Sequence, residues 1–177
     1  ASFDAWAQQV VGLLDQARGA DLAIFPELFT LSLFTTLPDW QNRPVAELIQ
    51  VDRYTQAYRD FFAAEARARG QHIVAGSHLE KRGDGYLNVS YVYGPNGLVH
   101  EHEKTHIFPA EANWSTGEGT RMEAFDLPFA RVGINICYET EIPECAASLT
   151  EQGAEIILCP SFTFTEYGFW RVRHCAQ

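Results

Sequence analysis

The sequence has no apolar run long enough to cross a bilayer, and stretches such as Val10–Leu14 and Ile156–Leu158 cover only a few residues. It also has no CxxC pair, and its four cysteines are not spaced like a disulfide framework. Positive charge is scarce, because 13 Lys and Arg stand against 23 Asp and Glu and give a formal charge of -10. We therefore expect a cytoplasmic protein with no disulfides and no nucleic-acid or membrane partner.

Helical and strand patterns alternate along the 177 residues. Apolar residues at helical spacing predict helices over residues 2–18, 51–69, 143–152 and 167–177. Short apolar runs predict buried strands over residues 22–25, 72–75, 132–136 and 156–159. The turn Gly94-Pro-Asn-Gly97 predicts a hairpin that joins strands 86–93 and 98–103. This order indicates an α/β fold with a mixed sheet covered by helices, formed by one domain over residues 1–177.

Three residues with suitable chemistry follow predicted strands, at the point where each strand ends. They are Glu27, Lys104 and Cys137. Ligands of α/β proteins gather at the carboxyl ends of strands, so we expect these side chains to converge. By residue type alone, a strand-end cysteine is more often a small core residue, and a single Glu or Lys is more often a solvated charge.

The three side chains would serve acyl transfer. A thiol attacks a carbonyl carbon as thiolate, so it needs a base or a nearby cation. Glu27 can accept the proton of Cys137 and later pass it to a leaving amine. Lys104 and the backbone N–H of Tyr138 can stabilise the oxyanion. Glu111 can orient Lys104 or the substrate.

Three local motifs, in this order along the chain, resemble those of the nitrilase, or carbon–nitrogen hydrolase, superfamily. Phe25-Pro-Glu-Leu28 resembles its glutamate motif. Glu103-Lys-Thr-His-Ile-Phe-Pro109, followed by Glu111, resembles its lysine motif. Gly133-Ile-Asn-Ile-Cys-Tyr-Glu139, followed by Pro143-Glu144, resembles its cysteine elbow. The likeness covers nearly the whole chain.

The resemblance implies a four-layer α-β-β-α sandwich and a catalytic triad of Glu27, Lys104 and Cys137 that works through a thioester. It also implies Glu111 as a second, supporting glutamate and no metal or organic cofactor. Members usually form dimers through helices beside the elbow, here residues 144–152 and the terminal helix. We therefore expect a homodimer or higher oligomer in the full-length protein.

The sequence departs from the family pattern in three places. Glu141 stands where family elbows often carry Arg or Gln, and it resembles a subgroup that is sometimes fused to an acetyltransferase domain. A strand before the first helix and strands after the last helix are absent from the sequence. We therefore expect a partial domain, incomplete at both ends.

Other polar and aromatic residues have weaker claims to function. His100, His102 and His106 lie near Glu101 and Glu103, but no HExxH or Cys/His pairing accompanies them, so we expect no metal site. Asn88 resembles a recurring family asparagine with a structural role. Three aromatic residues after the last strand fit either a pocket wall or the core, namely Phe162, Phe164 and Trp170.

The function that we predict is hydrolysis of a carbon–nitrogen bond in a small linear amide, with release of ammonia or an amine. Three alternatives remain open. The same triad serves a nitrilase acting on nitriles, and it also serves an N-acyltransferase that passes the acyl group to an amine. A non-catalytic module that keeps the fold for dimerisation or partner binding is the alternative from another class.

Overall fold

A computed structural model describes residues 2–177, which contain two β-sheets. The first sheet has the order β1 (Leu22–Ile24), β2 (His72–Arg82), β3 (Gly85–Gly94) and β4 (Gly97–Glu103). The second has the order β5 (Phe125–Leu127), β6 (Ala130–Ile134) and β7 (Ile156–Leu158). Strands β1 and β2 are parallel, as are β6 and β7, and the other pairs are antiparallel. Both sheets are therefore mixed, as predicted.

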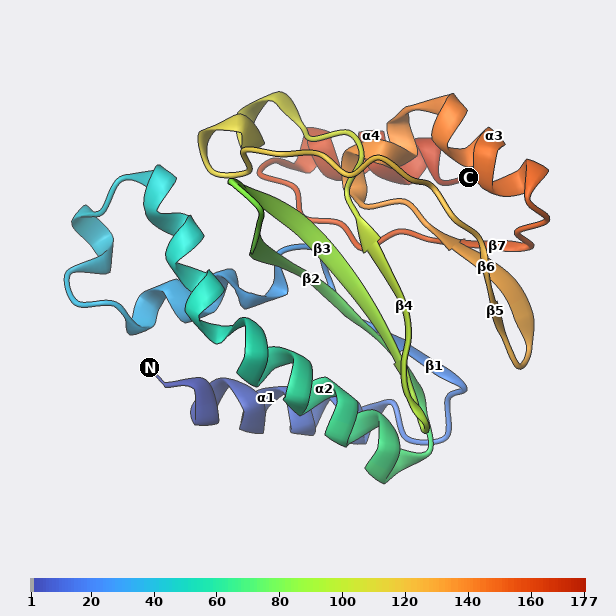
Figure 1. Cartoon of the computed structure of the whole chain (residues 1–177), viewed down its shortest axis with the longest axis horizontal. Helices are drawn as coiled ribbons and strands as arrows, with labels where there is room; N and C mark the ends of the chain where they lie inside the picture. The colour runs from blue at the N-terminus through green and yellow to red at the C-terminus, as the bar shows by residue number, and fades with distance from the viewer. Residues whose placement is uncertain (1) are drawn as a thin grey trace.

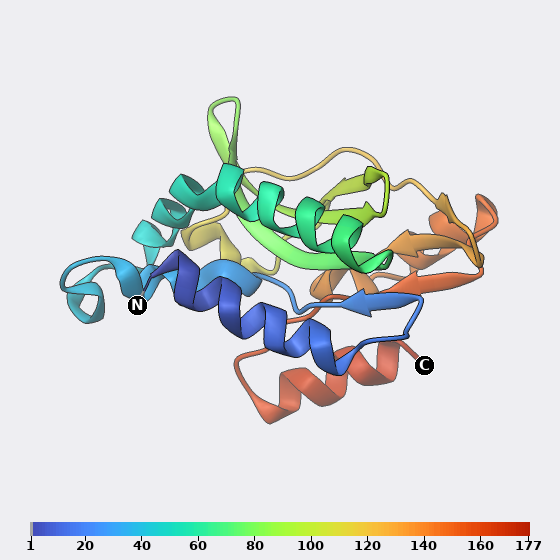
Figure 2. The ribbon, with the colours of Figure 1, turned by 90° about the horizontal axis from the view of Figure 1, so that it is seen from below.

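Four α-helices flank these sheets (Figures 1 and 2), namely α1 (Phe3–Gln16), α2 (Thr55–Arg69), α3 (Pro143–Glu151) and α4 (Glu166–Cys175). Helix α1 is amphipathic, and its buried residues Trp6, Val10 and Leu14 recur every four positions toward the first sheet. Its N-cap is Ser2, whose hydroxyl accepts a hydrogen bond from the N–H of Ala5. None of the helices described over residues 2–177 combines the length and apolarity needed to cross a bilayer.

The alternation of side chains along the strands assembles the layers. On β2, Ile73 and Ala75 pack toward α1 and α2, whereas Val74 packs with residues of the second sheet. On β6, Val132 faces the first sheet, and Gly133 on the opposite face leaves room for Leu149 of α3. The layers therefore run helix, sheet, sheet, helix, which confirms the predicted four-layer α-β-β-α sandwich.

Three elements differ from the sequence prediction. The helix expected from Val51 begins at Thr55, because a 3-10 helix covers Val45–Tyr54. Strand β2 continues beyond Ala75 to Arg82, across a register shift between Val74 and Ser77. Strand β5 was not predicted, because Asp126 interrupts its apolar residues Phe125 and Leu127. The four cysteines are free thiols.

Candidate active site

Cys137 stands in a strained backbone conformation just beyond β6. Its φ of 49° lies in the left-handed region, which is uncommon for a residue with a side chain. The backbone N–H of Asn135 donates to the carbonyl of Leu158, and that of Cys137 donates to the carbonyl of Pro160, at 2.9 and 3.0 Å. These bonds extend the parallel pairing of β6 with β7 and hold the sharp turn in place. The thiol lies 3.5 Å from the carbonyl oxygen of Phe162.

The turn that carries Glu27 depends on a glycine of the neighbouring strand. The residue after Glu27 is Leu28, whose φ is also 49°. At Gly76, with φ of 74°, an added Cβ would lie 2.1 Å from the carbonyl oxygen of Pro26. Only glycine combines this φ with such a close approach, and so lets β1 bend beside β2. The turn directs the Glu27 carboxylate into the protein, where the residue is 3% exposed.

Glu27 and Glu111 share two buried donors. The ammonium group of Lys104 donates to Glu27 Oε1 at 2.6 Å and also to Glu111 Oε2. The amide of Asn88 donates to Glu27 at 2.9 Å and to Glu111 at 3.0 Å. A third donor to Glu27 is the backbone N–H of Phe162, at 3.0 Å. One cation therefore bridges two carboxylates, and both carboxylates are held by hydrogen bonds to their charged form.

Burial and neighbouring charges shift the pKa values of Glu27, Lys104 and Cys137. Burial raises the pKa of Glu27, and the attraction of Lys104 offsets this only in part. Burial acts to lower the pKa of Lys104, but Glu27 and Glu111 outweigh it and raise that pKa. Burial and the charge of Glu27 raise the pKa of Cys137 to about 12. At neutral pH the resting cysteine is therefore a thiol, beside a cation and a carboxylate of increased basicity.

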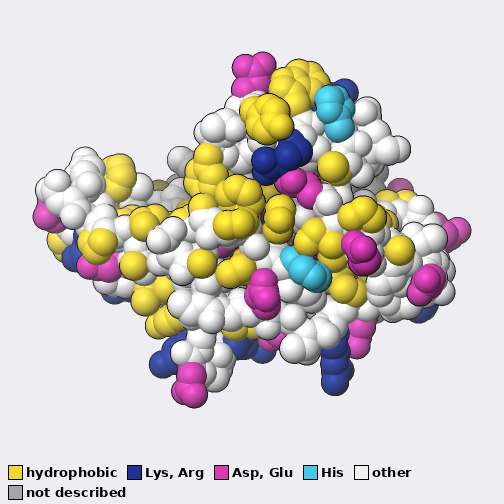
Figure 3. All heavy atoms as spheres, turned by 90° about the horizontal axis from the view of Figure 1, so that it is seen from above, with side chains coloured by type: hydrophobic (Ala, Val, Ile, Leu, Met, Phe, Trp, Pro, Cys, Tyr) yellow, Lys and Arg dark blue, Asp and Glu magenta, His cyan; other side chains and the backbone are white. Residues whose placement is uncertain are grey.

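One cavity of about 270 Å³ is lined by the side chains of Glu27, Lys104, Glu111 and Cys137. Much of its wall is aromatic, from Phe108, Trp114, Tyr138, Phe162 and Phe164. The ring of Tyr138 packs edge-on against Phe108, with 5.5 Å between their centres. Figure 3 views the molecule from the top of Figure 1 and shows hydrophobic side chains crowded at the centre of this face, with acidic and basic side chains among them. The cavity thus combines an apolar wall with a charged floor.

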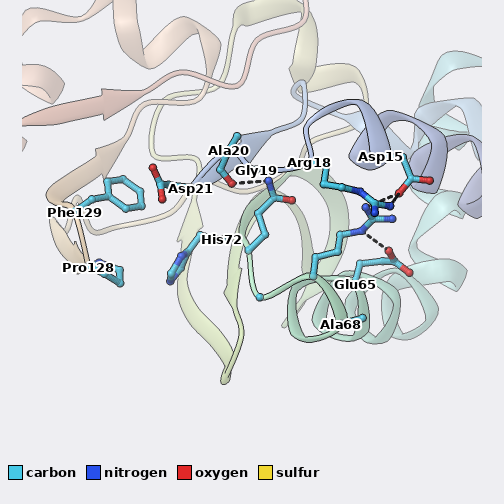
Figure 4. A pocket seen from close by; sticks show the side chains of 13 residues that line it. Asp15, Arg18, Gly19, Ala20, Asp21, Glu65, Ala68, His72, Pro128 and Phe129 are labelled. Atoms are coloured by element: carbon cyan, nitrogen blue, oxygen red, sulfur yellow. Dashed lines mark hydrogen bonds and ion pairs between the residues drawn. The ribbon is translucent and has the colours of Figure 1, made fainter.

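A larger cleft of about 700 Å³ lies where β1 and β2 begin, away from these residues. Figure 4 shows Asp15, Arg18 and Glu65 in one group of linked charged side chains, whereas Asp21 stands apart from it. Arg69 pairs with Asp15 and Glu65, each at 2.8 Å, and Arg18 also pairs with Asp15. The residues that line it, all between Asp15 and Phe129, include no thiol, hydroxyl or lysine. The chemistry therefore concentrates in the smaller cavity.

Glu139 ends the cysteine motif, but the sequence predicted no role for its side chain. It is fully buried, and its carboxylate accepts from the N–H of Ile136 at 2.6 Å, the N–H of Thr105 at 2.7 Å and His102 at 2.9 Å. Burial alone would raise its pKa, but the bonds to His102 and Thr105 lower it. It ties the segment before Cys137 to the residue after Lys104. The only feature of the sequence that could have indicated this role is a charged residue two positions after the strand-end Cys137.

The remaining sequence candidates fall into structural positions. Asn88, expected to be structural, bridges the two carboxylates inside the site. His100 stacks on Phe125 with ring centres 4.2 Å apart, and His102 is hydrogen-bonded to the carboxylate of Glu139. Over residues 2–177, His, Cys, Asp and Glu side chains form no group of three or more that is placed to hold a metal ion. The hydrogen bond from the backbone N–H of Phe162 to Glu27 was not predicted, because a backbone donor is present whatever the residue type.

The three motifs and the four-layer fold point to the nitrilase, or carbon–nitrogen hydrolase, superfamily. The profile described as carbon–nitrogen hydrolase matches residues 1–174, and the chain belongs to this family. A probable hydrolase of Bacillus subtilis, YhcX, is 33% identical over 99% of the chain and 34% of its own length. The omega-amidase NIT2 of Bos taurus is 30% identical over 84% of the chain and 55% of its own length. The chain thus spans from about a third to just over half of these relatives.

Solved structures share the fold. A carbon–nitrogen hydrolase from Helicobacter pylori G27 superposes with a TM-score of 0.79 at 24% identity, over 94% of this chain and 58% of that one. Nit3 of Saccharomyces cerevisiae, a member of branch 10 of the nitrilase superfamily, superposes with a TM-score of 0.71 at 22% identity, over 93% of this chain and 60% of that one. At these identities the likeness supports the architecture and says nothing of the substrate.

Proposed function

We propose that this chain carries the residues that hydrolyse a carbon–nitrogen bond in a small linear amide through a thioester on Cys137. The observation that carries the proposal is the Lys104 ammonium, which bridges Glu27 and Glu111 in the cavity that also holds the Cys137 thiol. A base, a cation and a nucleophile in one apolar cavity are the components of covalent acyl transfer.

In the first half-reaction, Glu27 removes the thiol proton as the sulfur of Cys137 attacks the amide carbon. The high pKa of the thiol and the raised pKa of Glu27 favour proton transfer during attack over a resting thiolate. The carbonyl oxygen becomes an oxyanion, which Lys104 and the backbone N–H of Tyr138 stabilise. Glu27 then returns the proton to the leaving nitrogen, the carbon–nitrogen bond breaks, and a thioester remains on Cys137.

In the second half-reaction, water replaces the departed amine. Glu27 takes a proton from the water as its oxygen attacks the thioester carbon, and a second oxyanion forms at the same position. The carbon–sulfur bond then breaks, the sulfur recovers a proton from Glu27, and a carboxylic acid leaves. Glu111 takes no proton in this scheme, and its bonds to Lys104 and Asn88 support a role in holding the ammonium group in position.

The test is to trap the acyl enzyme by acid quench and intact-mass analysis of the full-length protein with simple amides. We expect a mass increase equal to the acyl group in wild type, and no such increase in Cys137→Ala. The matched control is Cys175→Ala, because Cys175 is exposed and lies outside the cavity lining. An adduct that persists in Cys137→Ala would refute the nucleophile assignment. Ammonia release from amides but not from nitriles separates an amidase from a nitrilase, and a new amide product would indicate acyl transfer to an amine.

We further propose that the chain forms a single domain, that the full-length protein is a homodimer or higher oligomer, and that it acts in the cytoplasm. Exposed aromatic side chains on α4 support the dimer, since Tyr167, Phe169 and Trp170 are each more than 40% exposed. The free thiols favour a reducing compartment. Sedimentation analysis of wild type and Trp170→Glu tests the dimer, which the new charge should dissociate.

A further inference from the structure

Three side chains that can bind a metal ion gather around Thr105, the residue after Lys104. The hydroxyl oxygen of Thr105 lies 2.9 Å from Nδ1 of His106 and 3.4 Å from the sulfur of Met122. The same Nδ1 lies 3.6 Å from the sulfur of Cys145. An imidazole, a thioether and a thiol therefore meet at one place, whereas the catalytic cavity is lined by other residues.

The fold brings these three side chains together from separate segments. His106 follows β4, Met122 lies in the segment before β5, and Cys145 lies in the first turn of α3. Over residues 2–177, His, Cys, Asp and Glu alone form no group of three, so the third ligand here would be the thioether of Met122. Spacing along the sequence could not indicate such a site, because its members are far apart in the chain.

The hydroxyl group of Thr105 leaves these side chains free for another partner. It has one proton, and the carboxylate of Glu139 at 2.7 Å is a stronger acceptor than a thioether. The sulfur of Met122 therefore keeps its lone pairs, as does Nδ1 of His106 in the tautomer protonated at Nε2. Burial raises the pKa of Cys145 to about 11, so its thiol carries a proton that a metal ion must displace.

The distance between Cys145 and His106 fits one metal ion bonded to both. Zinc binds sulfur at about 2.3 Å and nitrogen at about 2.0–2.1 Å, and at tetrahedral to trigonal angles these bonds place the two atoms about 3.5–3.8 Å apart. The observed 3.6 Å lies within that range. His106 is exposed, so an ion can enter from its side although Cys145 is 2% exposed.

We propose that Cys145, His106 and Met122 bind a soft monovalent metal ion, Cu(I), at a site outside the catalytic cavity. Thiolate and thioether ligands favour Cu(I), whereas Mg²⁺ and Ca²⁺ require oxygen ligands. The thiol of Cys145 releases its proton to water as the sulfur binds the ion, and the oxidation state of the ion does not change. The bound ion joins the segment after Lys104 to α3. This site does not depend on the proposed amide hydrolysis.

Methyl NMR of the full-length protein, with ¹³C in the methyl groups of methionine, tests the ligand set. The protein carries Cys137→Ala and Cys175→Ala, because the proposed nucleophile and an exposed thiol would compete for the ion. The signal of Met122 is identified as the one that Met122→Leu removes. One equivalent of Cu(I), added without oxygen, should shift this signal, and Cys145→Ser should abolish the shift. A Met122 signal that Cu(I) leaves in place would overturn the proposal.

Competition with the Cu(I) chelator bicinchoninate measures the affinity in the same protein. Met122→Leu and His106→Gln should each weaken binding at least about 10- to 100-fold, because loss of a residue that only hydrogen-bonds to a metal ligand already has that effect. Cys159→Ala is the matched control and should keep the affinity, since its thiol contacts the hydroxyls of Thr140 and Ser161. Equal affinities in Met122→Leu and Cys159→Ala, or tighter binding of Zn²⁺ than of Cu(I), would refute the site.

Discussion

The backbone N–H of Phe162 donates a hydrogen bond to Oε2 of Glu27 at 3.0 Å, although 135 positions separate the two residues. Phe162 follows β7 of the second sheet, whereas Glu27 follows β1 of the first. The carbonyl of the same Phe162 lies 3.5 Å from the thiol of Cys137. One peptide segment therefore contacts both the proposed base and the proposed nucleophile, and it fixes the side of Glu27 that Lys104 does not occupy.

Glu27→Gln should lower kcat about 10²- to 10⁴-fold, the usual contribution of a positioned general base. The amide of Gln cannot accept the thiol proton. Its NH₂ group would also face Lys104 or the N–H of Phe162, which donate to the carboxylate in wild type. Single-turnover kinetics should show that formation of the thioester itself is slowed. Glu151→Gln, an exposed change at the end of α3, serves as the control and should keep the wild-type rate. A wild-type rate in Glu27→Gln would exclude Glu27 as the base.

Gly76→Ala should destabilise the fold by about 1–3 kcal/mol or more, because the new methyl group would meet the carbonyl of Pro26 at a positive φ. Gly12→Ala offers the opposite case, since Gly12 lies in α1 with no atom within 4 Å of an added Cβ. That change should stabilise the protein by about 0.5–1 kcal/mol. Urea denaturation of both variants measures the difference, and similar midpoints would contradict the structure around Pro26.

Glu139 should make stability depend on pH in the acidic range. Its folded pKa lies below the usual value of 4.5, so the carboxylate stabilises the fold above its unfolded pKa. That contribution is lost as the pH falls through the folded pKa. Urea midpoints measured from pH 7 to pH 3 should therefore fall less steeply in Glu139→Gln than in wild type. Parallel curves for the two proteins would show that Glu139 has no such role.

Cys137 should react slowly with a small thiol reagent such as methyl methanethiosulfonate at pH 7. Its pKa of about 12 leaves little thiolate, and its rate should continue to rise with pH beyond pH 9. Exposed Cys175 should be modified before Cys137 at neutral pH. Mass mapping of the modified cysteines at successive pH values checks the order. Faster labelling of Cys137 at pH 7 would mean that the resting cysteine is a thiolate.

The sequence predicted those parts of the structure that depend on local patterns. The period of α1, the Asn-Gly turn between β3 and β4, and the apolar runs of β6 and β7 each reflect a preference of adjacent residues. The motifs around Glu27, Lys104 and Cys137 located three residues that the structure gathers into one cavity. Their catalytic roles stay predictions.

Other features depend on contacts between distant segments and could not be predicted. The extension of β2 past Gly76 follows from its long antiparallel pairing with β3, which its mixed sequence did not indicate. The burial of Glu139 depends on His102 and Thr105, which approach it only in the folded chain. The partnership of Arg171 with Glu141 likewise arises because α4 returns to the turn after Cys137.

The division of the site between the two sheets has a mechanical consequence. Glu27 follows a strand of one sheet and Cys137 follows a strand of the other, so the apolar layer that includes Val74 and Val132 sets the separation between them. A proton transfers efficiently only over hydrogen-bond distances. We expect that trimming or enlarging a side chain in that layer would shift one sheet against the other and slow the proposed proton transfer from Cys137 to Glu27. A substitution in this layer would then affect the proposed proton transfer as well as the stability of the fold.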